Sequence, residues 1–134
     1  SYPAASAAGT FSMPRKSTSK GRQTPAAAPK TGVKYDIGKA EYDLIPAAAL
    51  DEMVIILTIG AQKYAAENWR KVPDGKRRYF AALQRHLWAW KRGQKFDQET
   101  GRHHLAHAAC NLFFLHELDL GLGEGPNAPT STKS

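Results

Sequence analysis

Two histidines and an asparagine lie at helical spacing in the C-terminal half of the chain. His104, His107 and Asn111 occupy positions i, i+3 and i+7, which places them within an arc of about 60° on one helix face. The same face continues through Phe114 and Leu118, so its polar part is confined to the N-terminal turns, where the helix dipole favours phosphate. Such a patch could bind a metal ion or a phosphate group.

Further potential ligands lie upstream of this patch. Asp97 and Glu99 come shortly before it, and His86 belongs to the preceding helical segment. Imidazole and carboxylate groups together are suitable ligands for a divalent transition metal. The alternative is that the histidines form a hydrogen-bonded core between helices and that Asp97 or Thr100 caps the helix that contains the patch. Spacing alone leaves both interpretations open.

The other two histidines are expected to have different roles. On a helix His103 would point about 100° away from His104, which favours a surface or substrate-facing position. His116 lies more than two turns beyond the patch. We expect it to be structural.

Basic residues in three segments could bind the phosphates of a nucleotide. Arg85 precedes His86 and could hold a phosphate through its planar guanidinium group. Lys39, in a glycine-containing polar segment, and Lys63, near the end of the first helix, could add ammonium charges.

Amide and aromatic groups could recognise the base or the sugar. Asn68 and Trp69 follow the first helix and could bind a base by hydrogen bonding and stacking, although a plain helix end explains Trp69 equally well. Asn111 shares the face of the two histidines and is a further candidate. We expect Trp88, in the second helix, to pack in the core.

Three helical segments must position these residues. Apolar spacing and stop signals predict helices over about 47–66, 77–92 and 102–120. Pro46 is a favoured first-turn residue, and Asp43 is a possible cap. Alternating β-branched segments with turn dipeptides are missing, so the predicted fold class is all-α.

The middle of the first helix predicts self-association. Residues 53–57 are Met-Val-Ile-Ile-Leu and are apolar on every side. A helix without a polar face must be surrounded, and a domain of about 90 residues can hardly do this alone. We therefore expect a homo-oligomer, either a dimer or a tetramer.

Composition divides the chain into a folded unit and two tails. Residues 1–30 are expected to be a disordered basic tail, 31–120 the folded domain and 121–134 a flexible tail. The formal charge is +7, but residues 1–30 hold five basic and no acidic side chains, so the remainder carries about +2. We therefore expect no specific nucleic-acid partner.

Several protein classes are excluded by missing patterns. A single cysteine, Cys110, allows no intramolecular disulfide and is expected to be a small buried thiol. No apolar run has the length of a membrane span or a signal peptide, so we expect no membrane partner and a location in the host cytoplasm. The phosphate loop, the G-x-S-x-G elbow and the His-Asp dipeptide are missing as well.

Six short motifs together resemble those of a known family. The sequence is similar to phage dATP/dGTP pyrophosphohydrolases, a branch of the MazG/HisE-like all-α superfamily. The resemblance covers about residues 34–118. The motifs are Lys39–Pro46, Gly60–Tyr64, Asn68-Trp69, Arg85-His86, Asp97–Gly101 and His104–His107.

The resemblance implies a MazG-like helical domain in an oligomeric bundle, and an enzyme that needs divalent ions. It implies hydrolysis of dGTP and dATP to the monophosphate and pyrophosphate, in the service of phage DNA that contains 2-aminoadenine. The superfamily holds its ions through E-x-x-E and E-x-x-D motifs, whereas this sequence has His104-Leu-Ala-His107 at the second position and no E-x-x-E. From this sequence we therefore predict the metal ligands His86, Asp97, Glu99, His104 and His107.

Imidazole ligands favour Mn²⁺ over Mg²⁺, which is the second choice. Glu99 is expected to accept the proton of the attacking water and Asp97 to act mainly as a ligand, so both are assigned to catalysis. Two alternatives remain open. One is a housekeeping pyrophosphohydrolase of other nucleotides, and the other is a zinc-stabilised or basic nucleic-acid-binding module, although its single cysteine is poorly placed for structural zinc.

Overall fold

The structure is a computed structural model that describes residues 30–130. The chain divides into two units, residues 1–44 and 45–134. In the first unit, a short 3-10 helix, η2 (Tyr42–Leu44), follows an exposed segment in which Lys39 and Asp36 form an ion pair of 3.9 Å. The expected disordered tail, residues 1–30, lies outside the described residues except for Lys30. The candidate site belongs to the second unit.

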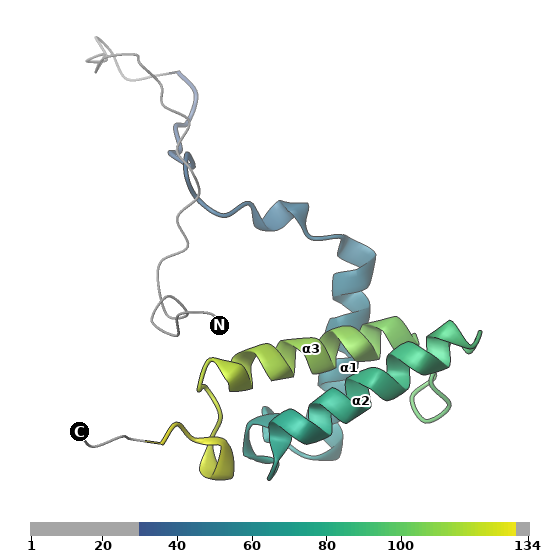
Figure 1. Ribbon diagram of the computed structural model, residues 1–134. Coiled ribbons are helices and arrows are strands. Elements are labelled where there is room, and N and C mark those ends of the chain that lie inside the picture. The colour runs from purple at the N-terminus through teal and green to yellow at the C-terminus, as the bar shows by residue number, and fades with distance from the viewer. Residues whose placement is uncertain (1–29, 131–134) are drawn as a thin grey trace. The chain divides into compact units, whose positions relative to one another are not determined.

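The second unit contains three α-helices: α1 (Ala47–Lys63), α2 (Gly75–Lys91) and α3 (His104–Asp119). Figure 1 shows α2 and α3 side by side, and α1 packs across α3. Two 3-10 helices complete this unit, η3 (Asn68–Lys71) and η4 (Gly125–Asn127). Among the described residues there is no strand, only an isolated bridge between Phe96 and His103. The all-α prediction is therefore confirmed.

The connection between α1 and α2 explains where the predicted helix ends differ from the structure. α1 ends at Lys63, three residues before the predicted end, and Glu67 and Asp74 adopt positive φ angles of 58° and 56°. α2 begins at Gly75, two residues earlier than predicted, directly after the left-handed Asp74. A Cβ atom at Gly75 would lie 2.9 Å from Leu118 Cδ1, so glycine allows the start of α2 to approach the end of α3. Pro46 is the N-cap residue of α1 and not part of its first turn, and no side chain caps this end; Asp43, the expected cap, lies in η2.

The hydrophobic core lies between the helices and is small. Its buried hydrophobic side chains, among the described residues, are Ile56, Ala108, Cys110 and Leu118. Cys110 is 2% exposed, which confirms the expected small buried thiol, and burial raises the pKa of this thiol to about 11. Trp88 was expected in this core but is 52% exposed. That prediction was wrong because no other helix among residues 30–130 covers its side of α2.

The segment after α3 is anchored to the second unit, although the sequence predicted a flexible tail from residue 121. Asn127 donates hydrogen bonds to the carbonyl oxygens of Arg70 (3.0 Å) and Val72 (2.6 Å). Arg70 pairs with Glu117 at 3.0 Å and donates to the Leu122 carbonyl at 2.7 Å. These bonds join η3, the end of α3 and η4. None of the helices within residues 30–130 is long and apolar enough to cross a membrane.

Candidate metal centre

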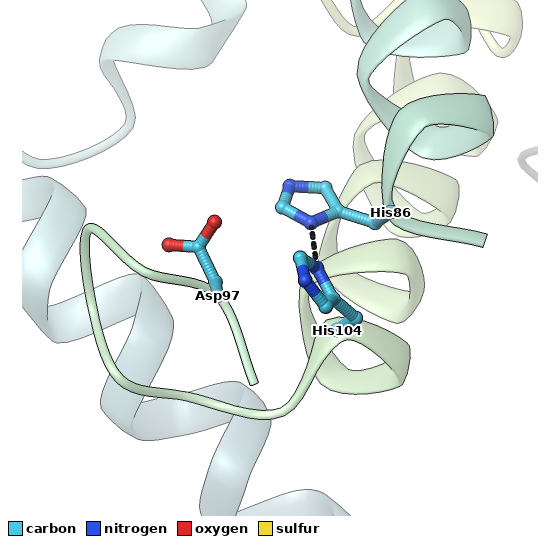
Figure 2. A group of neighbouring side chains, drawn as sticks. All are labelled: His86, Asp97 and His104. Carbon is cyan, nitrogen blue, oxygen red and sulfur yellow. Dashed lines mark hydrogen bonds between the residues drawn. The ribbon is translucent and has the colours of Figure 1, made fainter. Parts of the chain in front are cut away.

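Three potential metal ligands converge near the N-terminal end of α3. His86 comes from α2, His104 is the first residue of α3, and Asp97 comes from the connecting loop (Figure 2). One ligand atom from each lies within 4.8 Å of the others. The Nδ1 atoms of His86 and His104 are 2.9 Å apart. The structure therefore brings together three of the five predicted ligands.

The loop between α2 and α3 is folded back on itself, and this places Asp97 opposite the histidines. The amide of Asp97 donates to the Arg102 carbonyl at 2.8 Å, and the amide of Gly101 donates to the Asp97 carbonyl at 2.7 Å. Gly101 has a φ of 72°, a left-handed conformation that glycine adopts without strain. The His104 amide donates to the Lys95 carbonyl at 2.9 Å, so the loop is tied to the start of α3.

Thr100, which was expected only as a possible cap of α3, connects Asp97 with His107. Its hydroxyl lies 3.0 Å from Asp97 Oδ2 and 2.6 Å from His107 Nε2. The ring of His107 stacks on that of His86, with centroids 4.5 Å apart and an angle of 6° between the planes. His107 thus lies beside the converging trio. The Asp97-x-x-Thr100 spacing, typical of a turn closed by an aspartate side chain, was the available signal.

The protonation states of these groups suit metal binding. Burial lowers the pKa of His86 from its ordinary 6.5 to about 4, and the charges of His107, His104 and Arg85 act in the same direction. Burial also lowers the pKa of His107. Burial of Asp97 alone would raise its pKa, but hydrogen bonds from Thr100 outweigh it, and the net shift is downward. At neutral pH His86 and His107 are neutral and Asp97 is charged, so the ligands His86 and Asp97 have the protonation that metal binding requires.

Glu99 and two of the predicted phosphate-binding residues lie at the edge of the centre. Glu99 is exposed and forms an ion pair of 2.6 Å with Lys63 at the end of α1. This pair raises the pKa of Lys63. Arg85 is exposed on α2, and its charge acts on His86. A second ion pair, Arg102–Glu52 at 3.1 Å, also joins the loop to α1.

The predicted base-binding residues are not gathered at the centre. Trp69 stacks on Phe114 with ring centroids 4.8 Å apart, and the Arg70 guanidinium lies 4.2 Å from the centroid of the Trp69 ring. Phe114 is seven residues beyond His107, or about 10 Å of helix rise. Asn111 is buried and donates to the His107 carbonyl at 2.8 Å. Asn68 is the first residue of η3. Lys39, which was predicted to bind phosphate, belongs to the other unit of the chain.

His103 and His116 are not among the three converging ligands. His103 is the N-cap of α3, and its Nδ1 accepts a hydrogen bond from the Leu105 amide at 3.0 Å. The expected cap from Asp97 or Thr100 was therefore wrong, because the hydrogen bonds of their side chains close the loop instead. His116 is exposed on the last turns of α3.

The depressed pKa of His86 predicts an acid-sensitive fold when metal is removed by EDTA. The unfolded chain binds a proton at His86 near pH 6.5 and the folded protein only near pH 4, so protonation favours the unfolded state between these values. We expect the melting temperature to fall steadily as the pH decreases through this window. His86→Gln should flatten the decrease, whereas a His116→Gln control should keep it. Identical slopes for both variants would contradict the assignment.

Comparisons with known proteins agree with the resemblance seen in the sequence. Residues 29–124 match the family described as dATP/dGTP diphosphohydrolase, N-terminal. A protein of Salmonella phage PMBT28 named dATP/dGTP diphosphohydrolase is 40% identical over 85 residues, which are 63% of this chain and 29% of that relative. The chain thus aligns with less than a third of the relative's length. No solved structure matches. Because the family match covers most of the chain, the protein belongs to the dATP/dGTP diphosphohydrolase N-terminal family.

Proposed function

We propose that this chain is a metal-dependent diphosphohydrolase that converts dGTP and dATP to the monophosphate and pyrophosphate. The observation that carries the proposal is the convergence of His86, Asp97 and His104, whose ligand atoms lie within 4.8 Å of one another. The name of the phage relative, dATP/dGTP diphosphohydrolase, supports the choice of substrates. A supply of dGMP for phage DNA containing 2-aminoadenine is proposed from the family resemblance alone.

The donor set fits a divalent ion. In a tetrahedral zinc site, a familiar case of imidazole ligation with Zn–N of about 2.0–2.1 Å, two imidazole nitrogens lie about 3.3 Å apart. The 2.9 Å between the Nδ1 atoms of His86 and His104 is about 0.4 Å shorter, a difference that side-chain rotation can supply. The carboxylate of Asp97 adds a charged ligand. Imidazole nitrogens favour a transition ion, so Mn²⁺ is proposed ahead of Mg²⁺.

The ion, when bound, would neutralise phosphate charge and acidify the attacking water. The chain's own groups would do the rest. Arg85, beside His86 on α2, and Lys63, paired with Glu99, are exposed cations and would hold the phosphates. A phosphate that binds Lys63 would release Glu99 from its ion pair. The freed carboxylate could then accept a proton from the water that attacks the α phosphorus.

We also propose that the protein acts as a homo-oligomer, a dimer or a tetramer. In the described part of the chain nineteen large hydrophobic side chains are exposed. Leu50, Val54 and Leu57 are among them and lie at i, i+4 and i+7 of α1, so they form one apolar stripe along the helix. An exposed stripe of this kind is stabilised when a second copy covers it.

The products of the reaction test the proposed activity. With Mn²⁺ and dGTP in water labelled with heavy oxygen, we expect dGMP and pyrophosphate, with the label in dGMP. Attack at the α phosphorus transfers the water oxygen to the monophosphate, and the β and γ phosphates leave together. Chromatography, phosphorus NMR and mass spectrometry identify the products and the label.

Other products would identify other reactions. Tripolyphosphate with the free nucleoside, or the diphosphate with orthophosphate, would exclude a diphosphohydrolase. Label in pyrophosphate would mean attack at the β phosphorus. No hydrolysis of dGTP or dATP with either ion would overturn the proposed activity.

A further inference from the structure

The hydrogen bonds of Thr100 can be assigned completely. A hydroxyl has one hydrogen to donate and two lone pairs to accept. The Arg102 amide, 3.2 Å away, can only donate, and the charged carboxylate of Asp97, 3.0 Å away, can only accept. The second lone pair therefore accepts from His107 Nε2 at 2.6 Å. Neutral His107 must then carry its proton on Nε2.

Thr100 also determines which oxygen of Asp97 is free. Oδ2 accepts from both the amide and the hydroxyl of Thr100, at 2.9 and 3.0 Å. In the described part of the chain, no hydrogen bond to Oδ1 is formed. Because one threonine occupies Oδ2 twice, the carboxylate is held with Oδ1 available to another ligand.

The effect of Thr100 extends to His86 through the stacked rings. His107 is held by Thr100 at Nε2 and lies parallel to His86 with centroids 4.5 Å apart. A fixed His107 ring limits the rotation of the His86 ring. His86 Nδ1 then stays 2.9 Å from His104 Nδ1.

We propose that Thr100 is a positioning residue that orients two metal ligands, Asp97 directly and His86 through His107. This inference rests on the metal centre of the proposed function. It gives His107 a supporting role beside the ion, and it leaves Asp97 Oδ1, His86 Nδ1 and His104 Nδ1 as the donor atoms. Groups that orient metal ligands in this way typically change metal affinity about 10- to 100-fold when they are lost.

Thr100→Val and Thr100→Ser separate the hydroxyl from the shape of the side chain. Valine keeps the branched shape and removes the hydroxyl, whereas serine keeps the hydroxyl. Titration calorimetry of the full chain with Mn²⁺ alone should show binding about 10- to 100-fold weaker for the valine variant. The serine variant should bind close to the wild-type value. Equal binding by wild type and the valine variant, or equal losses in both variants, would overturn the proposal.

The tautomer of His107 provides a second measurement that needs no metal. Nitrogen–proton correlation NMR of the metal-free protein, with His107→Gln to assign the signals, should show Nε2–H in wild type and in the serine variant. The valine variant should show a mixture of tautomers. An Nδ1–H tautomer in wild type would overturn the hydrogen-bond assignment. If wild type has the Nε2–H tautomer but binds no metal ion, the metal centre fails and the positioning role fails with it, whereas the hydrogen-bond assignment stands.

Discussion

His104→Ala is expected to lower Mn²⁺-dependent hydrolysis of dGTP by at least about 100-fold, because it removes one of the three converging metal ligands. His104 is buried, and its Nδ1 atom faces that of His86 at 2.9 Å. Binding of Mn²⁺ alone, measured by calorimetry, should weaken in parallel with activity. His86→Ala should have an effect of the same order, since it removes the facing nitrogen.

His116→Ala is the matched control for these variants. It removes an imidazole from the same helix, but its side chain is exposed and lies outside the centre. Its activity and metal affinity should stay close to wild type. Circular dichroism should show unchanged helicity in all three variants. Equal losses from the three substitutions, or full activity without His104, would contradict the metal site and favour a packing role for the histidines.

Val54→Glu is expected to dissociate the proposed oligomer. Val54 lies at the centre of the apolar stripe on α1 and is 50% exposed. A glutamate there would place an unpaired charge in an interface between copies, which costs several kcal/mol. Light scattering should give a multiple of 14.7 kDa for wild type at micromolar concentration. The variant should approach the monomer mass.

Gln62→Glu provides the control for the added charge. Gln62 is also exposed on α1 but lies about 80° around the helix from Val54. This variant should keep the wild-type mass. A monomeric wild type would contradict the oligomer, and dissociation by both variants would move the interface away from the stripe.

Local sequence patterns determined the helical elements. Apolar spacing and stop signals predicted three helices, and the ends of the second and third were correct within two residues. The first ended three residues early because Glu67 adopts a left-handed conformation in the turn that follows. The i, i+3 spacing of His104 and His107 also pointed to the start of α3 as the candidate site.

Contacts between elements required the tertiary structure. The sequence predicted His86 and His104 as ligands of one site, but their distance of 2.9 Å and the pairing of Lys63 with Glu99 across thirty-six residues could not be derived from it. Such distances depend on how helices cross and loops turn. His107 shares a helix face with His104, yet Thr100 holds it against His86. Whether Trp69 and Trp88 are packed or exposed also depends on the tertiary structure. Either aromatic side chain could pack or remain exposed, and only the position of α3 put Trp69 against Phe114 and left Trp88 uncovered. Helical periodicity is a property of neighbouring residues, whereas burial and ligand geometry depend on which surfaces the folded chain brings together.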